Sequence, residues 1–257
     1  MEVFASYCTD AGNVKDVNQD SLSVKIVNSP QGKIVFAVVC DGMGGLEQGE
    51  VASKEVVLAM NEWFHTGFAH MVATDSVDED DIYEQWHQQI DAVNQKIIRY
   101  SERTGLNMGT TLTALLIYGD QYYVCNVGDS RLYRIEKQLQ RVTVDQTVVA
   151  QEVRMGILTE EEAENDPRRN ILLQCVGASA VVEPQFDSGF VGDLATFVLC
   201  SDGLIHKITA DEIYNQFRPE VLIDKEAVEN ACTSLTSIAM ERGEKDNITV
   251  IGIVVRK

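Results

Sequence analysis

The stretch KIVFAVVCDGMGGLEQGE, residues 33–50, decides how the rest of the sequence is interpreted. Every residue from 34 to 40 is apolar, with branched or aromatic side chains prominent, which is typical of a strand buried on both faces. Asp41 follows that strand, and the glycines within residues 42–45 let the backbone approach whatever the carboxylate binds. A helix is predicted for residues 46–64. The chain from residue 33 to 64 is therefore expected to form a strand, an aspartate, a glycine turn and a helix, in that order.

Other apolar runs predict strands at residues 3–9, 21–27, 110–118, 122–127, 131–135, 195–200 and 248–255. Apolar side chains recur every three or four positions from residue 82 to 100, which predicts an amphipathic helix that ends before Gly105. Three pairs have capping-box spacing and predict helix starts: Ser76 with Glu79, Thr159 with Glu162, and Thr209 with Glu212. Residues 145–177 are long and irregular, which is typical of a mobile flap beside a site.

Composition narrows the possible partners and locations. The 257-residue chain has only four prolines and no low-complexity tract, so a single domain is expected. A formal charge of −19 argues against nucleic acid or an anionic membrane as a partner, because both require a basic patch. The sequence has no long apolar span and no signal-peptide pattern, which predicts a cytoplasmic protein.

The cysteines and histidines do not suggest a transition-metal site. The six cysteines are widely spaced and form no Cys-x-x-Cys pair, so we interpret them as reduced core residues. The four histidines do not cluster in the sequence, and we interpret them as structural or surface residues: His65, His70, His87 and His206.

Five aspartates border predicted strands: Asp20, Asp41, Asp129, Asp202 and Asp246. Aspartate is a common turn residue, so any single position is weak evidence. Strand ends can converge on one rim of a sheet, however, and carboxylates gathered there repel one another unless cations neutralise them. Oxygen ligands favour magnesium or manganese, and two such ions activate water for hydrolysis of a phosphate ester.

Six motifs occur in an order that resembles the metal-dependent protein serine/threonine phosphatases of type 2C: NQD (18–20), DGMGG (41–45), GTT (109–111), VGDSR (127–131), CSDGL (200–204) and DNIT (246–249). The resemblance spans nearly the whole chain. It implies an α+β fold, a four-layer α-β-β-α sandwich of two antiparallel sheets with helices outside. It also implies one catalytic domain over residues 1–257, with the flap at 145–177.

The implied activity is hydrolysis of phosphoserine and phosphothreonine monoesters in proteins by a metal-activated water at a centre of two manganese or magnesium ions. Phosphorylated proteins and a cognate serine/threonine kinase are the implied partners, and a monomer is expected. The alternative is a catalytically weak member that acts as a binding or sensing module; loss of a metal aspartate would mark it, and all five are present.

The resemblance assigns metal binding to six residues: Asp20, Asp41, Gly42, Asp129, Asp202 and Asp246. Asp41 would bridge two ions, the Gly42 carbonyl would bind one of them, and Asp20 would act through water. The catalytic carboxylates, acting through metal-bound water, would be Asp41, Asp202 and Asp246. In bacterial members a third ion is held at the equivalent of Asp129 together with Asp202.

Four positions depart from the family pattern. Lys15 stands where an arginine usually clasps the substrate phosphate, and it offers a point charge without the bidentate fork. Met43 stands where eukaryotic members carry a histidine proposed as a general acid. Gln146 and Asp166 replace histidines of the bacterial flap.

The motifs admit two other readings. A dinucleotide fold would need a glycine where Glu47 stands, and the loop has no Walker lysine. Cys125 and Arg131 have the spacing of a cysteine-phosphatase loop, but Asp129 lies between them and Val124 replaces the usual histidine. Both readings are therefore disfavoured.

Overall fold

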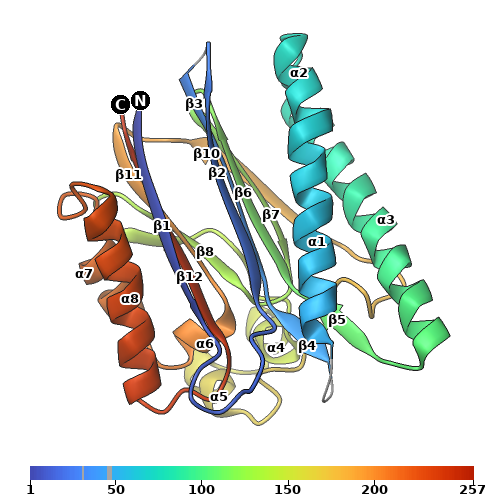
Figure 1. The fold of residues 1–257 in the computed structure, drawn as a ribbon. Coiled ribbons are helices and arrows are strands. Elements are labelled where there is room, and N and C mark those ends of the chain that lie inside the picture. The colour runs from blue at the N-terminus through green and yellow to red at the C-terminus, as the bar shows by residue number, and fades with distance from the viewer. Residues whose placement is uncertain (31, 45–47) are drawn as a thin grey trace.

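Two five-stranded antiparallel sheets lie face to face in the computed structural model, with helices on both outer sides (Figure 1). The structure describes residues 1–30, 32–44 and 48–257. This architecture confirms the α+β, four-layer prediction. None of the described helices is long and apolar enough to cross a membrane.

The strands form two large sheets and one small one. The first has the order β1 (Glu2–Asp10), β12 (Ile248–Arg256), β11 (Leu194–Cys200), β8 (Arg131–Ile135) and β9 (Leu139–Arg141). The second has the order β10 (Gln185–Phe190), β7 (Gln121–Val127), β6 (Leu112–Tyr118), β3 (Gly32–Cys40) and β2 (Ser21–Ser29). A two-stranded sheet pairs β4 (Gly42–Gly44) with β5 (Met108–Thr110).

The helices fall into three groups. Outside the second sheet lie α1 (Gly49–Trp63), the π-helical turn η1 (Phe64–Phe68), α2 (Ala69–Ala73) and α3 (Glu79–Thr104). Following β11 and along the first sheet lie α6 (Asp202–Ile205), α7 (Ala210–Phe217) and α8 (Lys225–Glu241). Two short helices, α4 (Val148–Arg154) and α5 (Glu160–Asn165), belong to the predicted flap below the sheets.

Three layers of apolar side chains lie between the four structural layers, and strand β3 contributes to two of them. Its side chains alternate: Val35 and Val39 pack between the two sheets, whereas Phe36 and Val38 pack under α1 and α3. A third apolar layer joins the first sheet to α7 and α8. Both faces of β3 are therefore buried, as its continuous apolar run predicted.

The strand register places the predicted aspartates at one end of the sandwich. Ser21 pairs with Cys40, so the residue before β2 lies opposite the residue after β3. In the other sheet Cys200 pairs with both Arg131 and Val250, so the end of β11 meets the starts of β8 and β12. This end of the sandwich, at the bottom of Figure 1, is called the rim below.

Several helix boundaries test the sequence predictions. The capping boxes at Thr159 and Thr209 are both formed, and α3 ends at a left-handed Gly105. The predicted start at Ser76 was wrong, because Asp78 caps α3 by accepting the N–H of Asp80. The helix predicted for residues 46–64 begins at Gly49 within the described residues, and the part at 46 and 47 lies outside them.

We predict that the aromatic cluster under α1 and α3 contributes strongly to stability. Trp86 is fully buried, with its ring centroid 5.3 Å from that of Trp63, so Trp86→Ala should lower the free energy of unfolding by about 3–5 kcal/mol in urea denaturation. Trp86→Phe should cost less, because the indole Nε1 has no hydrogen-bond partner among the described residues. The control Leu58→Ala, 51% exposed on α1, should stay within about 0.5 kcal/mol of the parent chain. Equal losses in Trp86→Ala and Leu58→Ala would contradict this assignment.

Candidate metal centre

The fold gathers all five predicted aspartates at the rim. Each follows or precedes a strand or helix there: Asp20 before β2, Asp41 after β3, Asp129 between β7 and β8, Asp202 at the start of α6, and Asp246 before β12. Asp20 and Asp129 are each 9% exposed, whereas the Asp246 side chain is 39% exposed. The cluster therefore has a buried floor and one side open to solvent.

Burial and mutual repulsion raise the pKa of the floor carboxylates. Burial, together with the charges of Asp202 and Asp246, raises the pKa of Asp20 to about 7, although hydrogen bonds from Thr249 and Ser201 oppose the shift. Burial raises the pKa of Asp41 well above its usual range, and the charges of Asp20 and Asp202 add to the shift. The ionised forms are thus costly without a compensating cation.

The same electrostatic coupling includes the other aspartates. Burial raises the pKa of Asp202; nearby His206 opposes the shift and Asp246 adds to it. Burial also raises the pKa of Asp129 well above its usual range, and the charge of Asp202 contributes. The charges of neighbouring aspartates therefore add to the effect of burial at Asp20, Asp41, Asp129 and Asp202.

The donor set fits hard divalent cations. Oδ1 of Asp20 and Oδ1 of Asp202 are buried oxygens with no hydrogen-bond partner in the described part of the chain. Carboxylate oxygens suit magnesium and manganese. Within residues 1–30, 32–44 and 48–257, no three His, Cys, Asp or Glu side chains already have metal-ligand spacing, so the carboxylates would have to draw together around an ion.

The GTT and GDS motifs fix the backbone of Asp41. Thr111 Oγ1 accepts the N–H of Asp41 at 2.9 Å, and Thr110 Oγ1 donates to the Asp41 carbonyl at 2.9 Å. Thr111 Oγ1 also lies 2.8 Å from Ser130 Oγ, next to Asp129. These hydroxyl contacts join the end of β3 to the β7–β8 turn and hold two of the five aspartates in register.

Gly42 has no room for a side chain. A Cβ at this position would collide with the carbonyl oxygens of Gly49 and Gln19. The first residue of α1 therefore packs directly on the backbone that follows Asp41. This contact explains the glycine after the strand and makes α1 a neighbour of the candidate centre.

Hydrogen bonds join the NQD motif to both the CSDGL and the DNIT motifs. Ser201 Oγ donates to Asp20 Oδ2 at 2.8 Å, and Asn247 Oδ1 accepts the N–H of Gln19 at 2.9 Å. The amide of Asn247 also donates to two carbonyls in the loop before β2. Asp20 and Asp246 are thus held close to each other, although they lie near opposite ends of the sequence.

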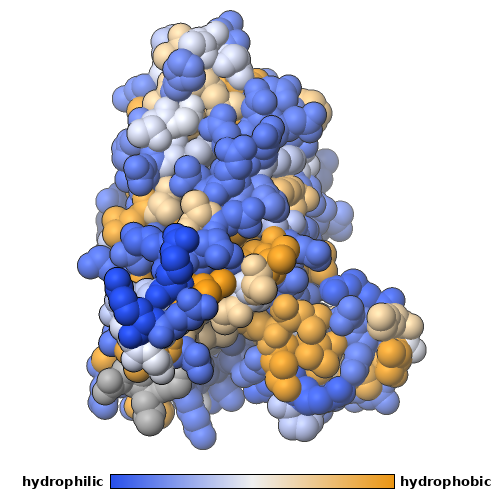
Figure 2. All heavy atoms as spheres, turned by 90° about the vertical axis from the view of Figure 1, so that its right-hand side faces the viewer, coloured by the Kyte–Doolittle hydropathy of each residue, from blue (hydrophilic) through white to orange (hydrophobic). Residues whose placement is uncertain are grey.

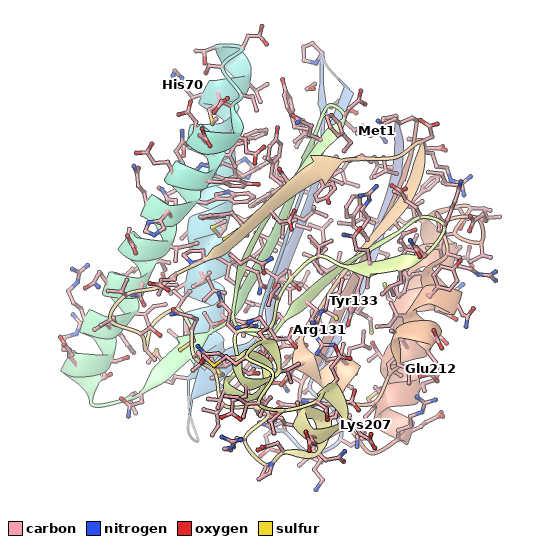
Figure 3. The ribbon with its side chains drawn as sticks, turned by 180° about the vertical axis from the view of Figure 1, so that it is seen from behind. Met1, His70, Arg131, Tyr133, Lys207 and Glu212 are labelled. Atoms are coloured by element: carbon pink, nitrogen blue, oxygen red, sulfur yellow. The ribbon has the colours of Figure 1, made fainter. Side chains whose placement is uncertain are left out.

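Two residues that the sequence reasoning missed support the aspartates. His206 Nε2 lies 3.5 Å from Asp202 Oδ2, and its Nδ1 lies 3.6 Å from Glu244 Oε2. Glu244 is 6% exposed, and its Oε1 accepts the N–H of Asp246 at 2.9 Å. The available signal was that His206 stands four residues after Asp202, one helical turn away. The other three histidines are exposed, and Figure 3 labels His70 far from the rim.

Lys15 reaches the open side of the cluster. Its Nζ lies 3.3 Å from Asp246 Oδ1, and its side chain is 44% exposed. The ammonium group is therefore placed where an anion approaching the rim would meet a positive charge beside the carboxylates.

The predicted flap is anchored next to Asp129. Gln146 and Gly128 exchange two hydrogen bonds: the Gln146 N–H donates to the Gly128 carbonyl, and Gln146 Oε1 accepts the Gly128 N–H at 2.8 Å. Asp145 receives three bonds of 2.7–3.2 Å from Arg131, which Figure 3 labels beside Tyr133. At the other end, the backbones of Thr110 and Val176 bond in both directions.

The geometry excludes the two disfavoured readings. Cys125 is fully buried within β7, burial raises the pKa of its thiol, and Arg131 is engaged by Asp145, so no anion-binding loop is available. Strand β3 lies between the antiparallel neighbours β2 and β6, which does not match the parallel sheet of a dinucleotide fold. All six cysteines are free thiols.

Comparison with known proteins gives matches across nearly the whole chain. The family profile "Protein phosphatase 2C" matches residues 11–245. The serine/threonine phosphatase stp of Listeria monocytogenes is 34% identical over 251 residues, covering 96% of this chain and 94% of that protein. The S. agalactiae serine/threonine phosphatase structure superposes with a TM-score of 0.84 at 29% identity over 100% of both chains. The catalytic domain of the phosphatase PstP, solved in complex with 2 manganese ions, has a TM-score of 0.77 at 29% identity, covering 98% of each chain.

We predict that cation binding at the rim raises the free energy of unfolding, which can be measured without an activity assay. Manganese at about a hundred times its Kd should raise the free energy of unfolding of the parent chain by about 2.7 kcal/mol, and that of Asp202→Asn by much less. In EDTA, Asp202→Asn should be at least as stable as the parent, because one repelling buried charge is removed. Urea denaturation measures both effects.

The control for this experiment is Glu102→Gln, an exposed change on α3, which should respond to manganese as the parent does. A parent chain whose stability ignores manganese would contradict the assignment.

Proposed function

The chain belongs to the protein phosphatase 2C family, and we propose that it hydrolyses phosphoserine and phosphothreonine monoesters in proteins at a centre of two manganese or magnesium ions. One observation carries the proposal: five mutually repelling aspartates, each within or beside a family motif, meet at one rim with two buried carboxylate oxygens unpartnered in the described structure. Such a cluster needs cations, and metal-assisted phosphate hydrolysis needs this ligand chemistry.

The candidate ligands divide into central and outer groups. We assign Asp41 as the carboxylate shared between two ions, with the Gly42 carbonyl, Asp202 and Asp246 as further direct ligands. Asp20 would act through water, and Asp129 would hold a third ion together with Asp202. When bound, the ions lower the pKa of a water molecule and offset the negative charge that develops on the phosphoryl group.

The remaining residues position these groups. Lys15 binds the substrate phosphate from the open side, where its ammonium group already pairs with Asp246. Thr110 and Thr111 hold the backbone of Asp41, and His206 steadies Asp202 from the side of α6. Met43 offers no proton donor to the leaving serine oxygen, so that proton comes from a group other than residue 43.

The flap at residues 145–177 is proposed to contact the protein substrate within a single catalytic domain. It is anchored at both ends beside the rim, and the segment between α4 and α5 exposes the apolar side chains of Met155 and Ile157. We further propose a cytoplasmic monomer that reverses the action of a cognate serine/threonine kinase. The acidic surface, at −19 overall, supports a protein substrate over a nucleic acid.

We predict that activity depends on the rim carboxylates and not on the buried thiol. Asp41→Ala and Asp246→Ala should each lower kcat/KM for a phosphothreonine peptide by about a hundredfold or more in manganese, and EDTA should abolish the parent activity. Phosphate release measures the rate.

Cys125→Ser is the matched control and should retain nearly full activity, since the thiol is buried away from solvent. An active Asp41→Ala would overturn the assignment. An inactive parent chain, folded and loaded with metal, would favour a binding or sensing role.

We predict that Lys15 contributes to phosphate binding more than to turnover. Lys15→Arg should lower KM for p-nitrophenyl phosphate with less effect on kcat, because a guanidinium offers two parallel bonds to a phosphate. Lys15→Gln should raise KM. Steady-state kinetics decide the matter: if KM is unchanged in both variants, Lys15 does not bind phosphate.

A further inference from the structure

A cavity of about 310 Å³ lies between α1, α3 and β5, and none of the five aspartates lines it. Its size falls at the lower end of the range typical of small-molecule sites. Apolar walls come from Val51 on α1, the buried Ile97 on α3 and the buried Met108 on β5. Tyr100 adds an aromatic ring to the lining.

The mouth of this cavity is basic, although the chain as a whole is acidic. Lys96, Arg99 and Arg103 project from one face of α3 at helical spacing and line the cavity with Glu55. Figure 2 shows the face over α3, where strongly hydrophilic side chains adjoin apolar ones low on the left. Three cations around one cavity are unusual in a chain with a formal charge of −19.

Two of these cations have no anionic partner in the described structure. Lys96 is neutralised, because its Nζ lies 2.5 Å from Glu55 Oε2. Arg99 and Arg103 have no carboxylate within ion-pair distance among the described residues, and the guanidinium carbon of Arg103 lies 5.6 Å from the centroid of the Tyr100 ring. Most other arginines of the chain bond to carboxylates or carbonyls, as Arg131 and Arg242 do.

We propose that this cavity binds a small amphipathic anion, a ligand with an apolar or aromatic body and one carboxylate, sulfonate or phosphate group. The body would lie against Val51, Ile97 and Met108, and the anionic group would meet Arg99 and Arg103. Guanidinium groups suit such anions because they present two parallel N–H donors.

Two elements that line the cavity also pack beside Asp41 of the candidate metal centre. Gly49, the first residue of α1, packs against Gly42, and Val51 follows in the same helical turn. Met108 pairs with Gly44 across the small β4–β5 sheet, which begins one residue after Asp41. A ligand bound between α1, α3 and β5 would therefore contact both elements that pack beside the Asp41 backbone, the start of α1 and the β4–β5 sheet. Its binding would shift these elements and so change the rate of turnover. This regulatory part rests on the proposed phosphatase function.

The binding experiment uses 8-anilinonaphthalene-1-sulfonate, an aromatic sulfonate that becomes fluorescent in apolar sites. The parent chain should bind this probe saturably. The Kd of the double variant Arg99→Glu/Arg103→Glu for the probe should be at least about ten times higher. The matched control is Arg218→Glu, an exposed arginine that also lacks a carboxylate partner in the described ranges. It should bind like the parent.

Equal binding by the parent and the double variant, or no binding by the parent, would overturn the proposed site. Both substituted side chains are exposed, so the double variant should fold like the parent. Circular dichroism checks this, and it separates a loss of probe binding from unfolding.

The activity experiment measures phosphate release from a phosphothreonine peptide with and without saturating probe. The rates of the parent and Arg218→Glu should change at least about twofold, while the double variant keeps its basal rate and does not respond. Probe binding without any change in rate would overturn the regulatory part. A parent that binds the probe but shows no basal hydrolysis would instead count against the proposed function, so the two failures are distinguishable.

Discussion

The mutual repulsion of largely buried carboxylates at the rim is the constraint on which the rest of the structure depends. Asp20, Asp41 and Asp202 lie in surroundings that raise the pKa of each, and each carboxylate makes ionisation of the others more costly. A fold keeps such an arrangement only where something compensates for it, and divalent cations do so most directly. The sandwich supplies the large apolar core that can bear this local cost.

Neutral groups do most of the positioning around these charges. Hydroxyls of Thr110, Thr111 and Ser201 bond to the backbone or carboxylate of an aspartate, and Asn247 bonds to the backbone beside Asp20. These contacts fix the aspartates without adding positive charge that would compete with a cation. Lys15 beside Asp246 and His206 beside Asp202 differ, because each can carry a positive charge, and Lys15 approaches from the solvent side.

The sequence predicted much of this arrangement because its strongest signals are local. Continuous apolar runs located β3 and β11, and the aspartate after each run is a property of adjacent residues. The edge strand β10, with the sequence QFDSGF, carries no such pattern and was not predicted, because its place depends on pairing with β7. The cap of α3 was misplaced for a similar reason, since Ser76 and Asp78 compete for one helix start.

Contacts between distant segments were also beyond sequence reasoning. His206 could not be placed between Asp202 and Glu244 until α6 and the loop before β12 were seen together. The basic cavity between α1 and α3 likewise depends on how two helices pack, although the arginines that border it are visible in the sequence. Helix spacing alone assigns them to a solvated face, and only the fold places an apolar hollow beside them.

The most direct test of the proposed centre of two ions is anomalous X-ray diffraction at the manganese edge from crystals of the chain grown with manganese. We expect two strong anomalous peaks between Asp41, Asp202 and Asp246, with Asp20 close to them. Crystals that diffract well and show no anomalous peak among these carboxylates would contradict the proposed centre.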